Sequence, residues 1–210
     1  MKGLLLKDVY MIEKYCKSFL LMIAVFIFIP FVIGENMFFV FYPSILCAML
    51  PTSLIGYDEK SGWNRYCGAL PYTKMQIVSG KYIINAVTGL AVIALTAIVQ
   101  AIQINSKGAF GAAEYFILLS VSLALFCFSS AVSLPLMFKF GVEKASLIRL
   151  VLFGIFFGCC GAASAVFKNT LNVQWTLPLA VVLTGLCIVS IVVYVISWYL
   201  SYIFYKNREV

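Results

Sequence analysis

The residues that could do chemistry are few, and they exclude several familiar catalytic sites. The 210-residue chain has no histidine, so it lacks a Ser-His-Asp triad and a zinc-binding His-Glu-x-x-His motif. Gly80 and Lys81 resemble the end of a phosphate-binding loop. However, Met75 stands where that loop needs its first glycine, and Tyr82 replaces its Ser or Thr. The sequence therefore predicts no enzyme, no metal and no cofactor in this chain, and no ATP bound through this motif.

The seven cysteines do not predict a metal or redox centre. Five of them lie in apolar stretches, and none shows the Cys-x-x-Cys spacing of a zinc or disulfide framework. We interpret them as small apolar side chains.

One polar stretch has the composition of a protein-binding surface. Residues 58–70 begin with acidic side chains, which suit the first turn of a helix, and Gly68 and Pro71 mark the end of that helix. Its aromatic and leucine side chains recur on one helical face, next to charges that suit contact with a partner. Alternatively, these aromatics lie in the lipid headgroup belt. The side chains expected to act here are Asp58, Glu59, Lys60, Trp63, Arg65, Tyr66 and Leu70.

Residues 1–17 are expected to form a separate amphipathic helix at the membrane interface. Drawn as a helix, most apolar side chains fall on one half and most lysines, including Lys7 and Lys14, on the other; Asp8 interrupts the apolar half. We expect this helix to contact a cytoplasmic partner. The alternatives are a merely basic leader that orients the first span and a cleaved signal peptide, which lacks a clear cleavage site.

The rest of the chain, residues 18–210, has the composition of a membrane domain. Hydrophobic residues make up 63% of the sequence and charged residues 11%, with a mean hydropathy of +1.03. Because a crossing needs about 20 apolar residues, we predict an all-α integral membrane protein with six transmembrane helices. The last stretch is expected to cross once, from about Val181, after an outer loop or shallow re-entrant turn. The stretches without Asp, Glu, Lys or Arg are 18–34, 36–57, 82–106, 115–138, 150–167 and 169–205.

The basic residues predict the orientation of these spans. With the N-terminus in the cytoplasm, all of the 15 Lys and Arg residues except Lys107 and Lys168 fall on the cytoplasmic side. Both termini are therefore predicted to be cytoplasmic in a multi-pass plasma-membrane protein. Topology and anionic lipid also explain the net charge of +7 better than nucleic-acid binding does.

The predicted spans lack the charges that ion-coupled transporters and voltage sensors use. None has a central Lys, Arg or Asp, so both classes are disfavoured. Asn85, Gln100 and Gln103 are expected to form hydrogen bonds between helices. Gly154 and Gly158 form a GxxxG pair, which allows close helix approach within the chain or between two chains.

Several of these residues together resemble a known family. The N-terminal MKGLLLKD, the YDE that begins at Tyr57, the pair Trp63 and Tyr66, and the Lys-Tyr that begins at Lys81 are similar to ABC type-2 transporter permeases. Among these, the chain resembles the small six-span bacterial permeases of phenol-soluble modulin exporters and bacteriocin-immunity exporters.

The resemblance implies partners and further site residues. Two permease chains, expected as a homodimer, would work with two separate ABC ATPase chains that bind ATP and Mg²⁺. Residues 58–70 would be the coupling helix that docks on the ATPase, and residues 1–17 the connecting helix. The pathway and dimer interface would be lined by Phe38, Phe39, Tyr42, Gly154, Phe156, Phe157 and Gly158.

The predicted function is that of the permease subunit of an ATP-driven exporter in the bacterial plasma membrane. The cargo expected first is an amphipathic peptide, such as a toxin or antimicrobial peptide, because aromatic side chains would line the pathway. Alternatives are a multidrug or lipid exporter of the same family, or a membrane sensor or scaffold that transports nothing.

Overall fold

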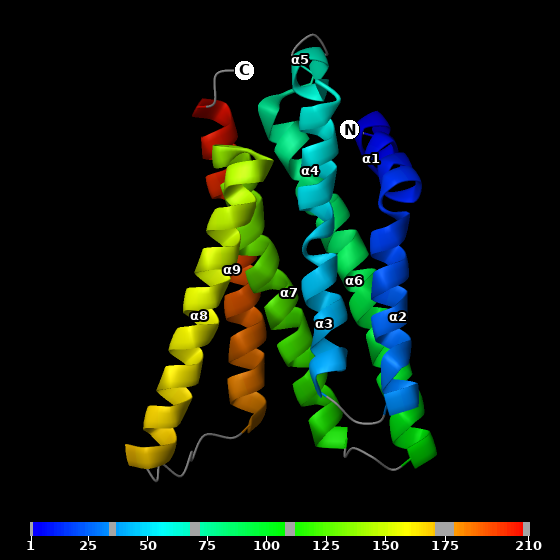
Figure 1. Ribbon diagram of the computed structural model, residues 1–210, viewed down its shortest axis with the longest axis vertical. Helices are drawn as coiled ribbons and strands as arrows, with labels where there is room; N and C mark the ends of the chain where they lie inside the picture. Colours follow the sequence, from blue (N-terminus) through cyan, green and yellow to red (C-terminus); the bar gives the residue numbers. More distant parts are fainter. Residues whose placement is uncertain (1, 34–36, 68–71, 108–111, 171–178, 208–210) are drawn as a thin grey trace.

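The computed structural model describes residues 2–33, 37–67, 72–107, 112–170 and 179–207, and within these ranges the chain is all-α (Figure 1). This confirms the all-α part of the predicted fold class. The helices are α1 (Lys2–Tyr15), α2 (Lys17–Ile33), α3 (Met37–Cys47), α4 (Leu50–Lys60), α5 (Trp63–Cys67), α6 (Lys74–Lys107), α7 (Ala112–Phe140), α8 (Val142–Thr170) and α9 (Leu179–Asn207).

The longer helices run along the long axis of the molecule, and the start of α1 and the end of α9 lie at the same end of it (Figure 1). The short helix α5 and the turn between α7 and α8 lie at this end too. We call it the terminal end. The first and last helices thus share one end of the molecule with the turn between α7 and α8, and the position of this end relative to a membrane stays a prediction.

Three helical segments are long and apolar enough to cross a membrane: Lys74–Ile102, Tyr115–Phe140 and Leu183–Asn207. A shorter apolar segment covers Lys17–Ile29. These segments support a membrane protein. Six crossings, and termini in the cytoplasm, stay predictions.

The second apolar stretch forms two helices instead of one. α3 ends at Cys47 and α4 begins at Leu50, with a turn at Ala48 and Met49. Pro51, in the first turn of α4, has no N–H to donate to a carbonyl one turn earlier, so one hydrogen bond of a continuous helix is missing at this point, and proline suits the first turn of the new helix. The stretch therefore contains a joint between its two halves.

Two helices begin well before the apolar stretches that predicted them. α6 begins at Lys74 and α8 at Val142, about two helical turns ahead of the predicted spans. α9 begins at Leu179, close to the predicted start of a single last crossing, while most of the predicted outer turn (residues 171–178) lies outside the described residues.

The core is centred on α7, which packs most extensively against α9 and also contacts α3, α6 and α8. Polar groups join α6 to α9 within it. The Tyr82 hydroxyl lies 2.7 Å from both Ser197 Oγ and Ser201 Oγ, and Asn85 Nδ2 donates to Tyr194 Oη over 3.2 Å. The expected interhelical role of Asn85 is thus confirmed. Gln100 is buried without a hydrogen bond among the described residues, and the side chain of Gln103 lies outside them.

Candidate functional site

Two lysines and two aspartates form a buried ion cluster at the terminal end. Lys7 Nζ lies 2.6 Å from Asp58 Oδ1, and Lys81 Nζ lies 2.6 Å from Asp58 Oδ2 and 2.8 Å from Asp8 Oδ1. Lys7 Nζ is also 3.4 Å from Asp8 Oδ1. Asp8 is 0% exposed, and Asp58 and Lys81 are 4% exposed. The four charges cancel, which allows them to be buried together, and they join α1, α4 and α6.

The cluster explains why Asp8 interrupts the apolar half of α1. Leu4 and Asp8 are both buried, one turn apart, and Leu4 packs closely against Gly80 on α6. By contrast, Val9 and Tyr15, assigned to the same apolar half, are about half exposed. The buried face of α1 therefore contacts α6 through a leucine and an aspartate, and Lys14 lies outside it, near the Tyr15 ring.

A second contact joins α5 to the cluster. The ammonium group of Lys7 lies 4.0 Å from the ring centroid of Trp63, a cation–π distance. Tyr66, on the same short helix, is 69% exposed. One aromatic of α5 thus contacts the cluster while the other is open to a partner.

The predicted coupling helix has a different form. Asp58 and Glu59 lie in the last turn of α4 and do not begin a new helix, because α4 continues to Lys60. Gly62, with a φ of 70°, turns the chain before α5 begins at Trp63. The side chain of Arg65 and all of Leu70 lie outside the described residues.

Asp58 therefore contacts its own chain. Its two carboxylate oxygens face Lys7 and Lys81, so it offers no free surface to a partner in this conformation.

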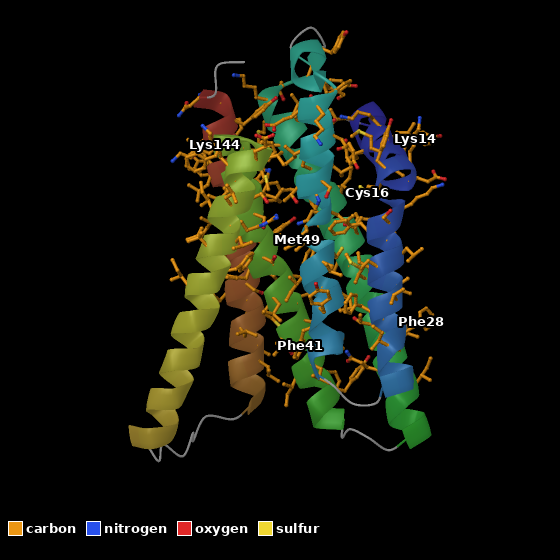
Figure 2. The ribbon with its side chains drawn as sticks, viewed as in Figure 1. Lys14, Cys16, Phe28, Phe41, Met49 and Lys144 are labelled. Atoms are coloured by element: carbon orange, nitrogen blue, oxygen red, sulfur yellow. The ribbon has the colours of Figure 1, made fainter. Side chains whose placement is uncertain are left out.

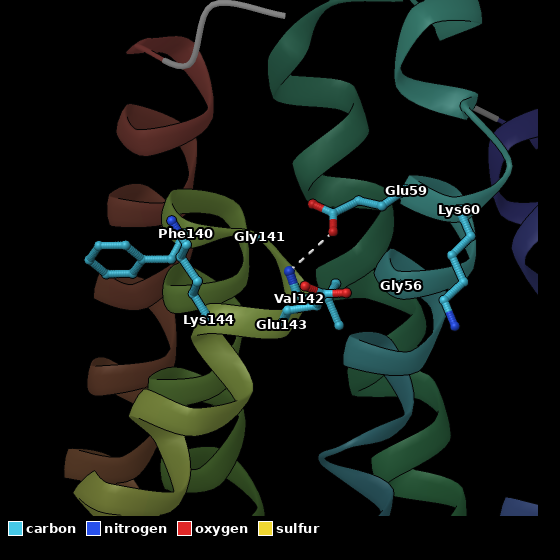
Figure 3. A pocket seen from close by; sticks show the side chains of 8 residues that line it. All are labelled: Gly56, Glu59, Lys60, Phe140, Gly141, Val142, Glu143 and Lys144. Carbon is cyan, nitrogen blue, oxygen red and sulfur yellow. Dashed lines mark hydrogen bonds between the residues drawn. The ribbon is translucent and has the colours of Figure 1, made fainter.

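Glu59 joins α4 to the start of α8. Its Oε2 accepts a hydrogen bond over 3.1 Å from the N–H of Val142, the first residue of α8 (Figure 3). A carboxylate at a helix N-terminus satisfies a backbone donor and interacts favourably with the helix dipole. This contact borders a cavity of about 500 Å³, which is lined by Gly56, Glu59, Lys60, Phe140, Gly141, Val142, Glu143 and Lys144.

The predicted pathway residues are only partly described. Tyr42 lines a cavity between α3, α7 and α8, and its ring centroid lies 4.3 Å from that of Phe26 on α2. Gly154 and Gly158 are exposed, and a methyl group added to either would meet no atom of the described residues within 4 Å. Packing among the described residues therefore does not account for this GxxxG pair. The side chains of Phe38, Phe39, Phe156 and Phe157 lie outside the described set.

Two labelled side chains in Figure 2 show one exposed and one buried position on the N-terminal helices. Phe28 on α2 points away from the bundle and is largely exposed, as expected for a surface in contact with lipid (Figure 2). Cys16 is buried at the joint between α1 and α2.

Within the described ranges, no group of His, Cys, Asp or Glu side chains forms a metal site. The free thiols there are Cys16, Cys47, Cys67, Cys127 and Cys187.

Sequence reasoning missed Lys81 and Arg149 as site residues. Both lie just before the predicted apolar stretches 82–106 and 150–167, whereas the structure has them inside α6 and α8. The sequence does contain a signal for Lys81: it follows Gly80, which leaves room for α1 to approach α6.

A family model described as "ABC-2 family transporter protein" matches residues 3–206. The match covers nearly the whole chain and agrees with the resemblance seen in its N-terminal residues. No curated protein and no solved structure matches the chain.

Proposed function

The chain belongs to the ABC-2 transporter family, and we propose that it is the membrane permease subunit of an ATP-driven exporter. Members of this family are the membrane components of ABC transporters and in general are not catalytic themselves, which implies a partner ATPase. In this proposal two ATPase chains bind ATP and Mg²⁺, and two copies of this chain form the pathway. The exposed Gly154 and Gly158 support a contact between two copies, because none of the described residues covers them.

The observation that carries the proposal is the connection from α5 to the ion cluster. Tyr66 is open to a partner, while Trp63 on the same helix contacts Lys7 in the cluster. The cluster in turn holds α1, α4 and α6 together. A partner that moves α5 therefore acts on three helices at once, as a coupling element must.

The cargo proposed first is an amphipathic peptide. The aromatic Tyr42 in an apolar cavity supports a pathway for molecules with an apolar face. Drugs and lipids share that property, and transport assays with vesicles distinguish them from peptides. Vesicles that hold this chain and its ATPase should accumulate the peptides when ATP is supplied.

The test of the proposal uses a variant that leaves the fold intact. The Tyr66→Ala chain, tagged and purified in mild detergent from its source cells, should recover much less ATPase than the unchanged chain. Tyr199→Ala is the matched control, because Tyr199 is a comparably exposed tyrosine on α9. Trp63→Ala and Glu59→Ala are less suitable variants, since both side chains make contacts within the chain.

Each outcome has a clear meaning. Recovery of an ATPase with a phosphate-binding loop, reduced only by Tyr66→Ala, supports the exporter and its docking surface. Recovery that Tyr66→Ala leaves unchanged refutes docking at α5. If the folded chain recovers no ATPase, it has no energy source, and a sensor or scaffold becomes the better interpretation.

A further inference from the structure

A second cavity, of about 410 Å³, lies between α3, α7 and α8 and differs in character from the one beside Glu59. Its walls are mainly apolar and include Tyr42, Phe128 and Phe153. The volume is in the range of small-molecule sites, which combine apolar walls with a few polar groups. Here the polar side chains are Ser129, Ser146 and Arg149.

Arg149 provides a positive charge with no counter-ion of its own. Its Nη1 donates to Thr52 Oγ1 over 3.3 Å, and it forms no ion pair with a carboxylate in the described part of the chain. A guanidinium has five N–H donors, so the described residues leave most of its hydrogen-bonding capacity unused. Such a cation beside apolar side chains is stabilised most by an anion that enters the cavity.

Ser129 is a second, independent indication of a ligand. It is 2% exposed and lines the cavity, yet its Oγ has no hydrogen-bond partner among the described residues. Buried hydroxyl groups are normally paired. A ligand in the cavity would supply the missing partner.

The position along α8 indicates how a ligand enters. Arg149 lies seven residues after Val142, about 10 Å along the helix from the terminal end. Leu150, which lines the cavity, and the neighbouring Leu147 are exposed, so the α8 side of the cavity borders apolar surface. A molecule with a charged head and an apolar chain can reach Arg149 from the membrane without leaving lipid.

We propose that this cavity binds a single-chain anionic amphiphile, with Arg149 holding its carboxylate or phosphate and Tyr42, Phe128 and Phe153 surrounding its apolar chain. The inference rests on the proposed function, because it names the charge class of the cargo. An anionic membrane phospholipid offers the same chemistry and is the second source to be tested.

Photolabelling of the purified chain tests the site without an ATPase. The chain is placed in nanodiscs of phosphatidylcholine with dodecanoic acid that carries a diazirine at its chain end; dodecanol with the same diazirine is the uncharged control. After irradiation, mass spectrometry maps the labelled peptides. We expect the acid to label α3, α7 and α8 around the cavity, about tenfold more strongly than the alcohol, because only the acid pairs with the guanidinium.

Variants identify the charge responsible. Arg149→Gln should lower labelling by the acid to the level of the alcohol, and Arg149→Lys should retain part of it. Lys144→Gln is the matched control, because it removes a charge near the same end of α8 from the other cavity. Equal labelling by acid and alcohol on the unchanged chain overturns the proposal, and this comparison does not depend on whether a variant folds.

Two further arms distinguish the sources of the amphiphile. If phosphatidylglycerol in the nanodisc displaces the acid and the acid leaves ATP hydrolysis of the assembled complex unchanged, the site holds a membrane lipid. If the acid raises ATP hydrolysis several-fold, it is cargo. Both results support the anion site. Since labelling uses the permease alone, failure of the site and failure of the exporter proposal are separate results.

Discussion

Replacing Lys81 by methionine should destabilise the chain by about 3–5 kcal/mol, the usual cost of removing one partner from a buried ion pair. The contacts account for this size. Lys81 Nζ makes hydrogen bonds of 2.8 Å to Asp8 and 2.6 Å to Asp58, and charge-assisted bonds contribute about 1.5–3 kcal/mol each. After the substitution, Lys7 faces two carboxylates, and Asp8, which is fully buried, keeps only the longer 3.4 Å contact.

A second substitution should restore much of this loss. In Lys81→Met with Asp8→Asn, the remaining Lys7 and Asp58 form a neutral pair at 2.6 Å, so no net charge stays buried. We expect the double variant to be more stable than Lys81→Met alone by about 2 kcal/mol, within the range of coupling energies between contacting residues. Lys74→Met is the matched control, because Lys74 is exposed on the same helix; it should cost less than about 0.5 kcal/mol.

The assay is unfolding by sodium dodecyl sulfate in mixed micelles, followed by circular dichroism and by tryptophan fluorescence. The free energies of unfolding of the four chains are compared under identical conditions. A loss of less than about 1 kcal/mol for Lys81→Met, or a double variant no more stable than the single one, would refute the reasoning that the four charges are balanced and buried.

Two other predictions concern packing and reactivity. Gly89→Ala should lower the free energy of unfolding by about 1–3 kcal/mol, because the added methyl group overlaps the ring of Phe126 on α7. Adding Phe126→Leu should recover part of this loss in the same unfolding assay. If the double variant recovers nothing, the overlap with Phe126 is not the source of the strain. Burial raises the pKa of the Cys67 thiol above its ordinary 9.0, and the nearby Asp58 raises the pKa further while Lys7 and Lys81 lower it. Only the thiolate reacts with maleimide. A chain with Cys67 as its single cysteine should therefore react more slowly than glutathione at pH 7.5, and its reaction rate should rise as the pH passes 9. A rate equal to that of glutathione at pH 7.5 would contradict the raised pKa of Cys67.

The sequence predicted the helical class well, because long apolar stretches have few other ways to satisfy their backbone groups in a membrane. It predicted helix ends less well. A count of charges places a boundary at the first charged residue, yet Lys81 and Arg149 both lie inside helices. Lys81 is paired there with a carboxylate, and Arg149 donates a hydrogen bond to Thr52 beside a mainly apolar cavity.

The candidate site depends on contacts that no local pattern contains. Asp8 and Lys81 are 73 residues apart in the chain, and Glu59 and Val142 are 83 apart. Helical periodicity can show that Asp8 lies on an otherwise apolar face, but it cannot show which helix supplies the opposite charge. The resemblance supplied a role for residues 58–70, and only the three-dimensional contacts separate Asp58, held within the chain, from Tyr66, open to a partner.

The connection between α7 and α8 has a mechanical consequence. Gly141, whose φ of 76° favours glycine, is the only residue between two helices of 29 residues each, so their joined ends cannot separate. Any rotation of α8 relative to α7 would therefore pivot at Gly141. A 10° swing would move its far end by about 7 Å, since the helix is about 43 Å long, but would move Arg149 by only about 2 Å. Such a rotation would separate the far ends of α7 and α8 while changing the proposed anion site little.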